Sequence, residues 1–196
     1  MGFGALALVV ILVLVAITSA FDKRKGTGYY TPYGPSSVRE DRRIIDKGKS
    51  LYRNGALNMG QRNCRPGFGA ANALKRAVDS WEEAAALGNV EAMTGLGIVA
   101  MDSGDLQAAQ VRWSEAFGKG DDAAYVFTRI TTDPSPKYSY KSAEGSYLGA
   151  MGDGNVGNMR YFAVIARSYS LTNFADELQW TADRIEQDDA QRRRPW

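Results

Sequence analysis

The chain has 196 residues, with 24 lysines and arginines against 22 aspartates and glutamates, no histidine and one cysteine. The absence of histidine excludes His-dependent catalytic triads and most catalytic zinc sites, and a single cysteine excludes an intrachain disulfide and a dithiol redox motif. Because the charges nearly balance, the chain as a whole has no preference for nucleic acid.

The first element in chain order is an apolar run, residues 3–21, which reads FGALALVVILVLVAITSAF without a charge. As a helix it spans roughly 28 Å, close to the hydrocarbon thickness of a bilayer. We predict that residues 1–21 form a single transmembrane anchor in contact with membrane lipid. The alternative is a cleaved signal peptide, because Thr18 and Ala20 are small enough to flank a cleavage point after Ala20. Its removal would leave a soluble secreted or periplasmic protein.

Basic residues follow the apolar run and none precedes it, which favours an uncleaved anchor. The basic residues behind the run are Lys23, Arg24, Lys25, Arg39, Arg42 and Arg43. Since cytoplasmic flanks of membrane helices are rich in lysine and arginine, we predict a single-pass protein with its N-terminus outside and its remaining part in the cytoplasm. Residues 22–37 combine glycine, proline, serine and tyrosine without helical periodicity, so they are predicted to be a juxtamembrane linker.

Beyond the linker the sequence repeats itself. Ala77, Trp81, Glu83, Ala84, Gly88 and Ala92 recur with the same spacing as Ala109, Trp113, Glu115, Ala116, Gly120 and Ala124. A third copy follows at a similar interval, with Ala143, Tyr147, Ala150 and Gly154, and Trp180 follows Tyr147 at the same kind of interval. Upstream, Gly48, Tyr52 and Gly55 match the spacing of Gly97, Met101 and Gly104. Because the distance from Gly48 to Gly97 exceeds the repeat interval, this match implies an insertion between the first copy and the second.

Each copy has the pattern of a helix pair. Between residues 73 and 87, small and apolar residues recur every three or four positions opposite charged ones. Gly88 is placed to end that helix and Asn89 to cap the next. We therefore predict an all-α fold without a sheet, in which residues 38–190 form an α-solenoid of about four antiparallel helical hairpins. Its helices are expected at residues 38–54, 71–87, 89–103, 105–118, 121–131, 138–152, 155–169 and 172–189.

The run from Trp81 to Gly97, WEEAAALGNVEAMTGLG, followed by Gly104-Asp105 and by Ala109 to Trp113, resembles the Sel-one-like subclass of the tetratricopeptide repeat family. The chain departs from the family's pattern in the insertion at residues 56–72, in the short helix at 121–131 and in Tyr147, which replaces a tryptophan. The resemblance implies a protein-interaction scaffold with a concave surface and without catalytic residues or a cofactor. We expect the repeated aromatic residues to pack in the core.

The insertion is the first of two candidate partner-binding segments. Residues 59–69, MGQRNCRPGFG, are rich in turn formers and are expected to form a loop that carries Arg62, Arg65 and Phe68. A mobile connector without a binding role is the alternative for this segment.

The second candidate is the basic tail at residues 191–196, QRRRPW. It places Arg192, Arg193 and Arg194 beside Trp196, a composition suited to an anionic membrane surface or an acidic groove of a partner. The alternative is a frayed tail that only adds solubility.

Two other patterns carry little weight. Residues 152–157, GDGNVG, have the spacing of a dinucleotide-binding loop, but they follow a predicted helix where such a loop needs a strand, so we expect a turn between helices. The acidic pair Asp121-Asp122 is interpreted as helix-end charge. We expect a membrane-anchored scaffold that binds protein partners, as an adaptor or an accessory subunit of a membrane complex. It is expected to have no small-molecule substrate, cofactor or nucleic-acid ligand; an enzyme is the alternative, but no residue spacing supports one.

Overall fold

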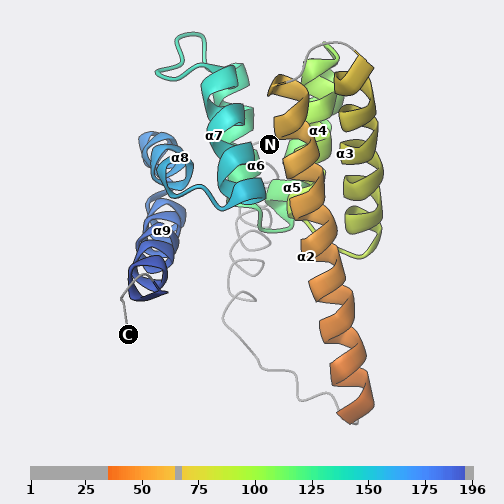
Figure 1. Ribbon diagram of the computed structural model, residues 1–196. Helices are drawn as coiled ribbons and strands as arrows, with labels where there is room; N and C mark the ends of the chain where they lie inside the picture. The colour runs from red at the N-terminus through yellow and green to blue at the C-terminus, as the bar shows by residue number, and fades with distance from the viewer. Residues whose placement is uncertain (1–34, 65–67, 193–196) are drawn as a thin grey trace, which may run out of the picture. The chain divides into compact units, whose positions relative to one another are not determined.

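The computed structural model describes residues 35–64 and 68–192, which form helices joined by short turns (Figure 1). The helices are α2 (Pro35–Cys64), α3 (Phe68–Ala86), α4 (Glu91–Asp102), α5 (Leu106–Gly118), α6 (Asp122–Thr132), α7 (Tyr140–Asp153), α8 (Val156–Ser168) and α9 (Thr172–Arg192). None of the described residues is in a strand, so the all-α prediction is confirmed for this part of the chain.

Residues 39–196 form one compact unit by their contacts, and residues 1–38 form another, of which the structure describes only Pro35–Val38 at the start of α2. Within the described ranges, no helix is long and apolar enough to cross a bilayer. The apolar run at residues 3–21 lies outside those ranges, so the predicted anchor stays a prediction.

The first helix is longer than the sequence predicts. Seven helices begin and end close to their expected bounds, but α2 continues to Cys64, well past its expected end at residue 54. The loop prediction for residues 59–69 was therefore wrong for residues 59–64, which are helical, and for Phe68 and Gly69, which begin α3. Ala56 and Met59 are buried at helical spacing, and this packing outweighs the poor helix propensity of the glycines and asparagines around them.

Four of the turns between helices have the same two features, a glycine and a polar cap. A glycine with positive φ ends the preceding helix in each, at Gly88, Gly104, Gly120 and Gly154. The residue that follows each glycine is an asparagine or aspartate whose side-chain oxygen accepts a hydrogen bond from a backbone N–H in the first turn of the next helix. The left-handed glycine and the polar cap together reverse the chain, and this sets the antiparallel arrangement of consecutive helices.

The core is organised around two buried tryptophans. The indole N–H of Trp81 in α3 donates to the backbone carbonyl of Tyr52 in α2 at 3.0 Å, and that of Trp113 in α5 donates to the carbonyl of Thr94 in α4 at 3.2 Å. Both side chains are fully buried. Each of these tryptophans therefore packs on the helix that comes before its own in the chain, α3 on α2 and α5 on α4.

A glycine makes each of these contacts possible. Gly55 and Gly97 lie one helical turn beyond the accepting carbonyls, and a Cβ at either position would lie 2.3 Å from the indole nitrogen. The equivalence of the two contacts aligns Gly55 of α2 with Gly97 of α4. The sequence comparison had paired Gly48 with Gly97, and that register was therefore wrong.

Trp180 does not belong to this series. Tyr147 is 1% exposed, like the two tryptophans before it, but Trp180 is 61% exposed, so its assignment to the core was wrong. The buried alanines of α9, Ala175 and Ala182, have the same spacing as Ala143 and Ala150 of α7, and this register puts Gln179 at the place of Tyr147. Trp180 is one residue beyond Gln179, and each residue turns the side-chain direction by about 100° around a helix. The Trp180 side chain therefore faces solvent.

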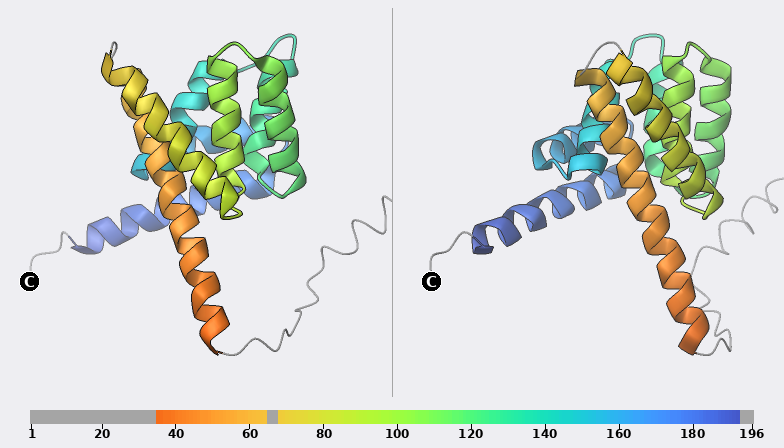
Figure 2. Two further views of the ribbon diagram at one scale, coloured as in Figure 1. Left: turned by 90° about the vertical axis from the view of Figure 1, so that its right-hand side faces the viewer. Right: turned by 45° about the vertical axis from the view of Figure 1, so that its right-hand side comes forward.

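The long helix α2 contacts two different parts of the stack. It lies against α3 through Trp81, and on its other side it lies against α7, where a Cβ on Gly152 would come within 3.0 Å of the Leu57 nitrogen (Figure 1). The last turns of α9 project away from the other helices, and the side chains at residues 186–192 are exposed (Figure 2). These two helices border the groove described next.

Candidate binding groove

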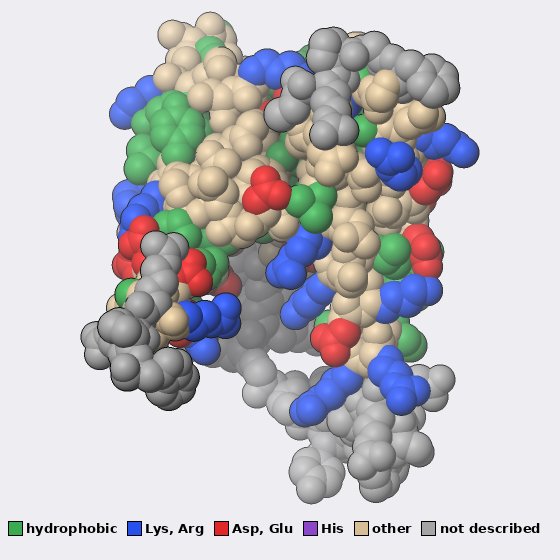
Figure 3. Space-filling model, in the orientation of Figure 1, with side chains coloured by type: hydrophobic (Ala, Val, Ile, Leu, Met, Phe, Trp, Pro, Cys, Tyr) green, Lys and Arg blue, Asp and Glu red, His purple; other side chains and the backbone are tan. Residues whose placement is uncertain are grey.

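A groove of about 600 Å³ opens between α2 and α9. The turns that precede α4 and α6 also line it, and its floor includes side chains from α7 and α8. Figure 3 shows lysine and arginine side chains along the first half of α2. The apolar floor consists of Tyr52, Tyr147, Met151, Met159, Phe174 and Leu178.

Two tyrosines join the walls of the groove at its floor. The hydroxyl of Tyr52 in α2 donates to the hydroxyl of Tyr147 in α7 at 2.5 Å, and both side chains are buried. Burial raises the pKa of both phenols well above the ordinary value of 10, so both are neutral at physiological pH. The pair therefore acts as a neutral hydrogen-bonded link between α2 and α7, through two residues that are 95 positions apart in sequence.

Asp121 lies beside this pair at the turn before α6. One carboxylate oxygen accepts a hydrogen bond from the backbone N–H of Ala123 and caps α6, and the other accepts one from the Thr94 hydroxyl at 2.5 Å. The residue is 8% exposed, and burial raises the pKa of its carboxyl group to about 6, although both hydrogen bonds favour the charged form. The sequence analysis correctly placed Asp121 at a helix end, but it did not predict that the side chain is buried.

The rim of the groove is richer in carboxylates than in amines. Glu91, Asp122 and Glu177 line it together with Asp121, against two lysines, Lys49 and Lys119. The Lys119 ammonium is already paired with Glu115 at 2.7 Å. Within the described ranges, no group of three or more acidic or cysteine side chains is arranged to hold a metal ion. An apolar floor under an acidic rim is suited to binding a segment that carries both cationic and large apolar side chains.

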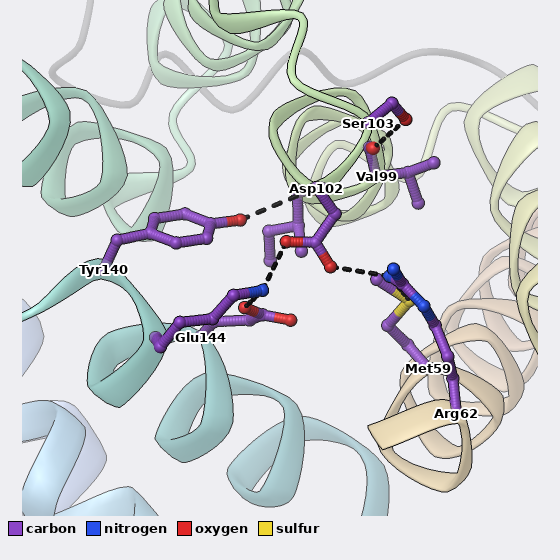
Figure 4. Close-up of polar contacts among 9 residues, drawn as sticks. Met59, Arg62, Val99, Asp102, Ser103, Tyr140 and Glu144 are labelled. Carbon is purple, nitrogen blue, oxygen red and sulfur yellow. Dashed lines mark hydrogen bonds and ion pairs between the residues drawn. The ribbon is translucent and has the colours of Figure 1, made fainter. Parts of the chain in front are cut away.

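A second polar cluster joins three helices at the far end of α2 (Figure 4). Asp102 in α4 accepts a hydrogen bond from Arg62 in α2 and one from Lys141 in α7, both at 2.6 Å, and Lys141 also bonds Glu144 at 2.7 Å. Both carboxylate side chains are nearly inaccessible, at 4% and 1% exposed. Burial works against the charge on Lys141, but the two carboxylates outweigh it and raise the pKa of the ammonium group.

This cluster is electrically balanced, with two cations and two carboxylates, so the buried charges compensate one another. It gives Arg62 a role inside the fold, because the guanidinium group faces Asp102 (Figure 4). The cluster stabilises the packing of α2 on α4 and α7. Binding of a partner by Arg62 stays a prediction, and it would compete with this ion pair.

The other predicted site residues are only partly covered by the structure. Phe68 is the first residue of α3 and Arg192 the last residue of α9, where its side chain is exposed. Arg65, Arg193, Arg194 and Trp196 lie outside the described residues. The described residues of the two predicted segments lie in α2, α3 and α9, and the groove draws on residues that the sequence analysis did not single out as a site.

The turn at residues 152–157 has the conformation expected for a connection between helices. Gly154 has a φ of +65° and ends α7, and Asn155 caps α8. Gly152 packs on the backbone of α2. Comparison of the chain with protein-family models, with curated proteins and with solved structures gave no match.

Proposed function

We propose that this protein is a membrane-anchored helical-repeat scaffold that binds protein partners in the groove between α2 and α9, as an adaptor or an accessory subunit of a membrane complex. The groove is the observation that supports this proposal best, because it combines a volume of about 600 Å³ with an apolar floor and an acidic rim. The Sel-one-like resemblance and the α-solenoid arrangement of hairpins belong to the same proposal. Scaffolds of that kind bind partners on the concave side of the stack.

The membrane part of the proposal rests on the sequence alone. The apolar run at residues 3–21 is long enough to span a bilayer, and the basic residues directly behind it favour a cytoplasmic location for the helical region. A tether of this kind raises the local concentration of a binding groove near partners in the same membrane.

The groove is tested by partner capture with a matched pair of variants. Ile45 lines the groove and is 54% exposed, and Val164 on α8 is 47% exposed and does not line the groove. Both substitutions place a charge at an exposed apolar position, so neither is expected to unfold the protein. Cross-linking of the full chain in its membrane, followed by mass spectrometry, should lose its partners in Ile45→Glu and keep them in Val164→Glu. Equal capture by both variants would remove the groove from the proposal.

The anchor is tested separately. Deletion of residues 1–21 should leave groove-dependent capture in place if the helical region makes the main contact, and should abolish it if the anchor itself is the contact. Orientation is tested with a single cysteine introduced at exposed Glu82 in a Cys64→Ser background. A membrane-impermeant maleimide should label it only after lysis, and labelling in intact cells would place the helical region outside.

A further inference from the structure

Carboxylates determine the charge at the groove floor. Besides burial, charge–charge interactions with Asp121 and Glu91 raise the pKa of both Tyr52 and Tyr147, and interactions with Glu91 and Asp122 raise that of Asp121. Lys49 lies on the opposite wall and is exposed. A cationic side chain that enters the groove near the starts of α4 and α6 therefore lies close to the carboxylates of Glu91, Asp121 and Asp122.

The apolar part of the floor suits one large side chain. Met151, Met159 and Phe174 lie there together with Leu178 and Tyr147. Methionine side chains adapt their shape and make favourable contacts with aromatic rings, so this surface accommodates an indole better than a rigid pocket would. A suitable occupant therefore carries a bulky aromatic residue within a few positions of its cations.

The chain itself contains such a segment. Residues 192–196 read RRRPW, with three arginines and a tryptophan in five positions. We propose that the groove binds residues 192–196 of a second copy of this chain, with the tryptophan on the apolar floor and the arginines against the carboxylates of the rim. The inference rests on the groove being a binding surface, as in the proposed function, and adds the identity of one occupant.

A second copy is the favoured source of the occupant because α9 carries the start of the tail away from its own groove. Thr181 is the last residue of α9 that lines the groove, and α9 continues as a rigid helix to Arg192, which carries the chain about 16 Å away. The tail of a second copy can enter the groove without reversing this direction, and the mixing experiment below separates it from the tail of the same copy. Groove and tail are different surfaces, so the contact between copies is head-to-tail.

Peptide binding measures the contact directly. The full chain lacking residues 192–196 is purified in detergent, so that its groove is vacant, and a fluorescent peptide of residues 188–196 is titrated by anisotropy. Glu177→Lys, on the exposed rim, should weaken binding about tenfold, and added salt should weaken it further. Glu82→Lys, an exposed charge reversal on α3 outside the groove, should leave binding unchanged. A peptide that ends in alanine in place of tryptophan should also bind more weakly.

Mixing of variants tests the head-to-tail arrangement. Copies lacking residues 192–196 keep a groove, and Glu177→Lys copies keep a tail. With two different affinity tags, neither variant should capture another copy of itself above background, but the two should capture each other. Thermal unfolding of each variant confirms that it is folded.

The outcomes separate this inference from the proposed function. Absence of peptide binding, or equal binding by Glu177→Lys and Glu82→Lys, would overturn the inference, and loss of partner capture in Ile45→Glu would still support the scaffold. Peptide binding without mutual capture would also overturn it, because the groove would then take the tail of the same copy or a basic, aromatic segment from another protein. Mutual capture of copies together with unchanged partner capture in Ile45→Glu would support the inference and contradict the scaffold.

Discussion

The inner helices α3–α6 and the last hairpin, α8–α9, differ in both their turns and their contacts. The turns within α3–α6 each use a glycine with positive φ followed by an asparagine or aspartate, whereas the turn between α8 and α9 places Ser170 at a φ of +66°. In the inner helices a fully buried tryptophan lies on a glycine and donates to a backbone carbonyl. The last hairpin buries four alanines and four larger apolar side chains but no tryptophan, and ion pairs join its two helices: Arg160 contacts Asp183 and Glu186, and Arg167 contacts Asp176. A helix with neighbours on both sides is held in place by close packing on two faces, whereas the last helix packs on one face only.

The largest expected effect comes from removing an inner tryptophan. Trp113→Ala should cost about 3–5 kcal/mol of unfolding free energy, because the substitution leaves a cavity against Phe127, whose ring centroid lies 5.5 Å from that of Trp113. Chemical denaturation monitored by circular dichroism measures the loss. A change below about 1 kcal/mol would show that the tryptophan is not the central packing element of the inner helices.

The glycine under that tryptophan should be nearly as sensitive. Gly97→Ala places a Cβ 2.3 Å from the indole nitrogen, and we expect a loss of up to about 3 kcal/mol because the helices must move apart. Gly145→Ala in α7 is the matched control, since nothing lies within 4 Å of its Cβ position. That change should stabilise the protein by up to about 1 kcal/mol through helix propensity. Equal effects of the two substitutions would contradict the proposed close approach.

The capping residues extend the comparison to charge. Asp121 caps inner helix α6 and is buried, whereas Asn155 caps α8 and is exposed. Because the folded state raises the pKa of Asp121 from 3.8 to about 6, the folded protein binds this proton more tightly than the unfolded chain does. The stabilisation from protonated Asp121 is complete below pH 3.8 and is lost as the pH rises to about 6.

Asp121→Asn should therefore remove that dependence on pH and stabilise the protein at neutral pH by on the order of 2 kcal/mol. Denaturation midpoints between pH 4 and pH 7.5 provide the measurement. Asp105→Asn changes the equivalent cap of α5 at an exposed site, so it reports the effect of the cap alone. If both variants respond to pH in the same way, burial of Asp121 is not the cause.

The contrast between these regions also shows what the sequence reveals. Most helices and turns were predictable, because each Gly–Asn or Gly–Asp pair marks the end of one helix and the start of the next, and the buried residues recur at helical spacing. The extent of α2 could not be predicted, because Gly55 and Gly60 lower helix propensity. Gly55 is required because Trp81 packs closely against it, and this contact is visible only in the structure. Trp180 was misplaced because a shift of one residue in a repeat is small in sequence and large in angle.

The groove could not be predicted from the sequence, for a different reason. Its walls come from α2 and α9, at opposite ends of the described part of the chain, and from turns whose acidic residues have an ordinary capping explanation. No local pattern indicates that Tyr52 and Tyr147 meet. The single available signal was the repeated placement of carboxylates at the starts of α4 and α6, at Glu91 and at Asp121-Asp122, which puts negative charge at one end of the stack.

The smallest effect is expected at Trp180, and it provides the sharpest contrast with Trp113. The Trp180 ring is 61% exposed and its main described contact is the Arg184 guanidinium, 5.3 Å from the ring centroid. An exposed cation–π contact contributes less than about 1 kcal/mol, so Trp180→Ala should change the unfolding free energy by no more than that. Trp180 points away from the side of α9 that carries Leu178, so binding of the tail peptide should also stay unchanged. Two tryptophans of one helical stack would then differ severalfold in their contribution to stability, and a loss comparable to that of Trp113→Ala would show that the outer side of α9 is covered in the folded protein.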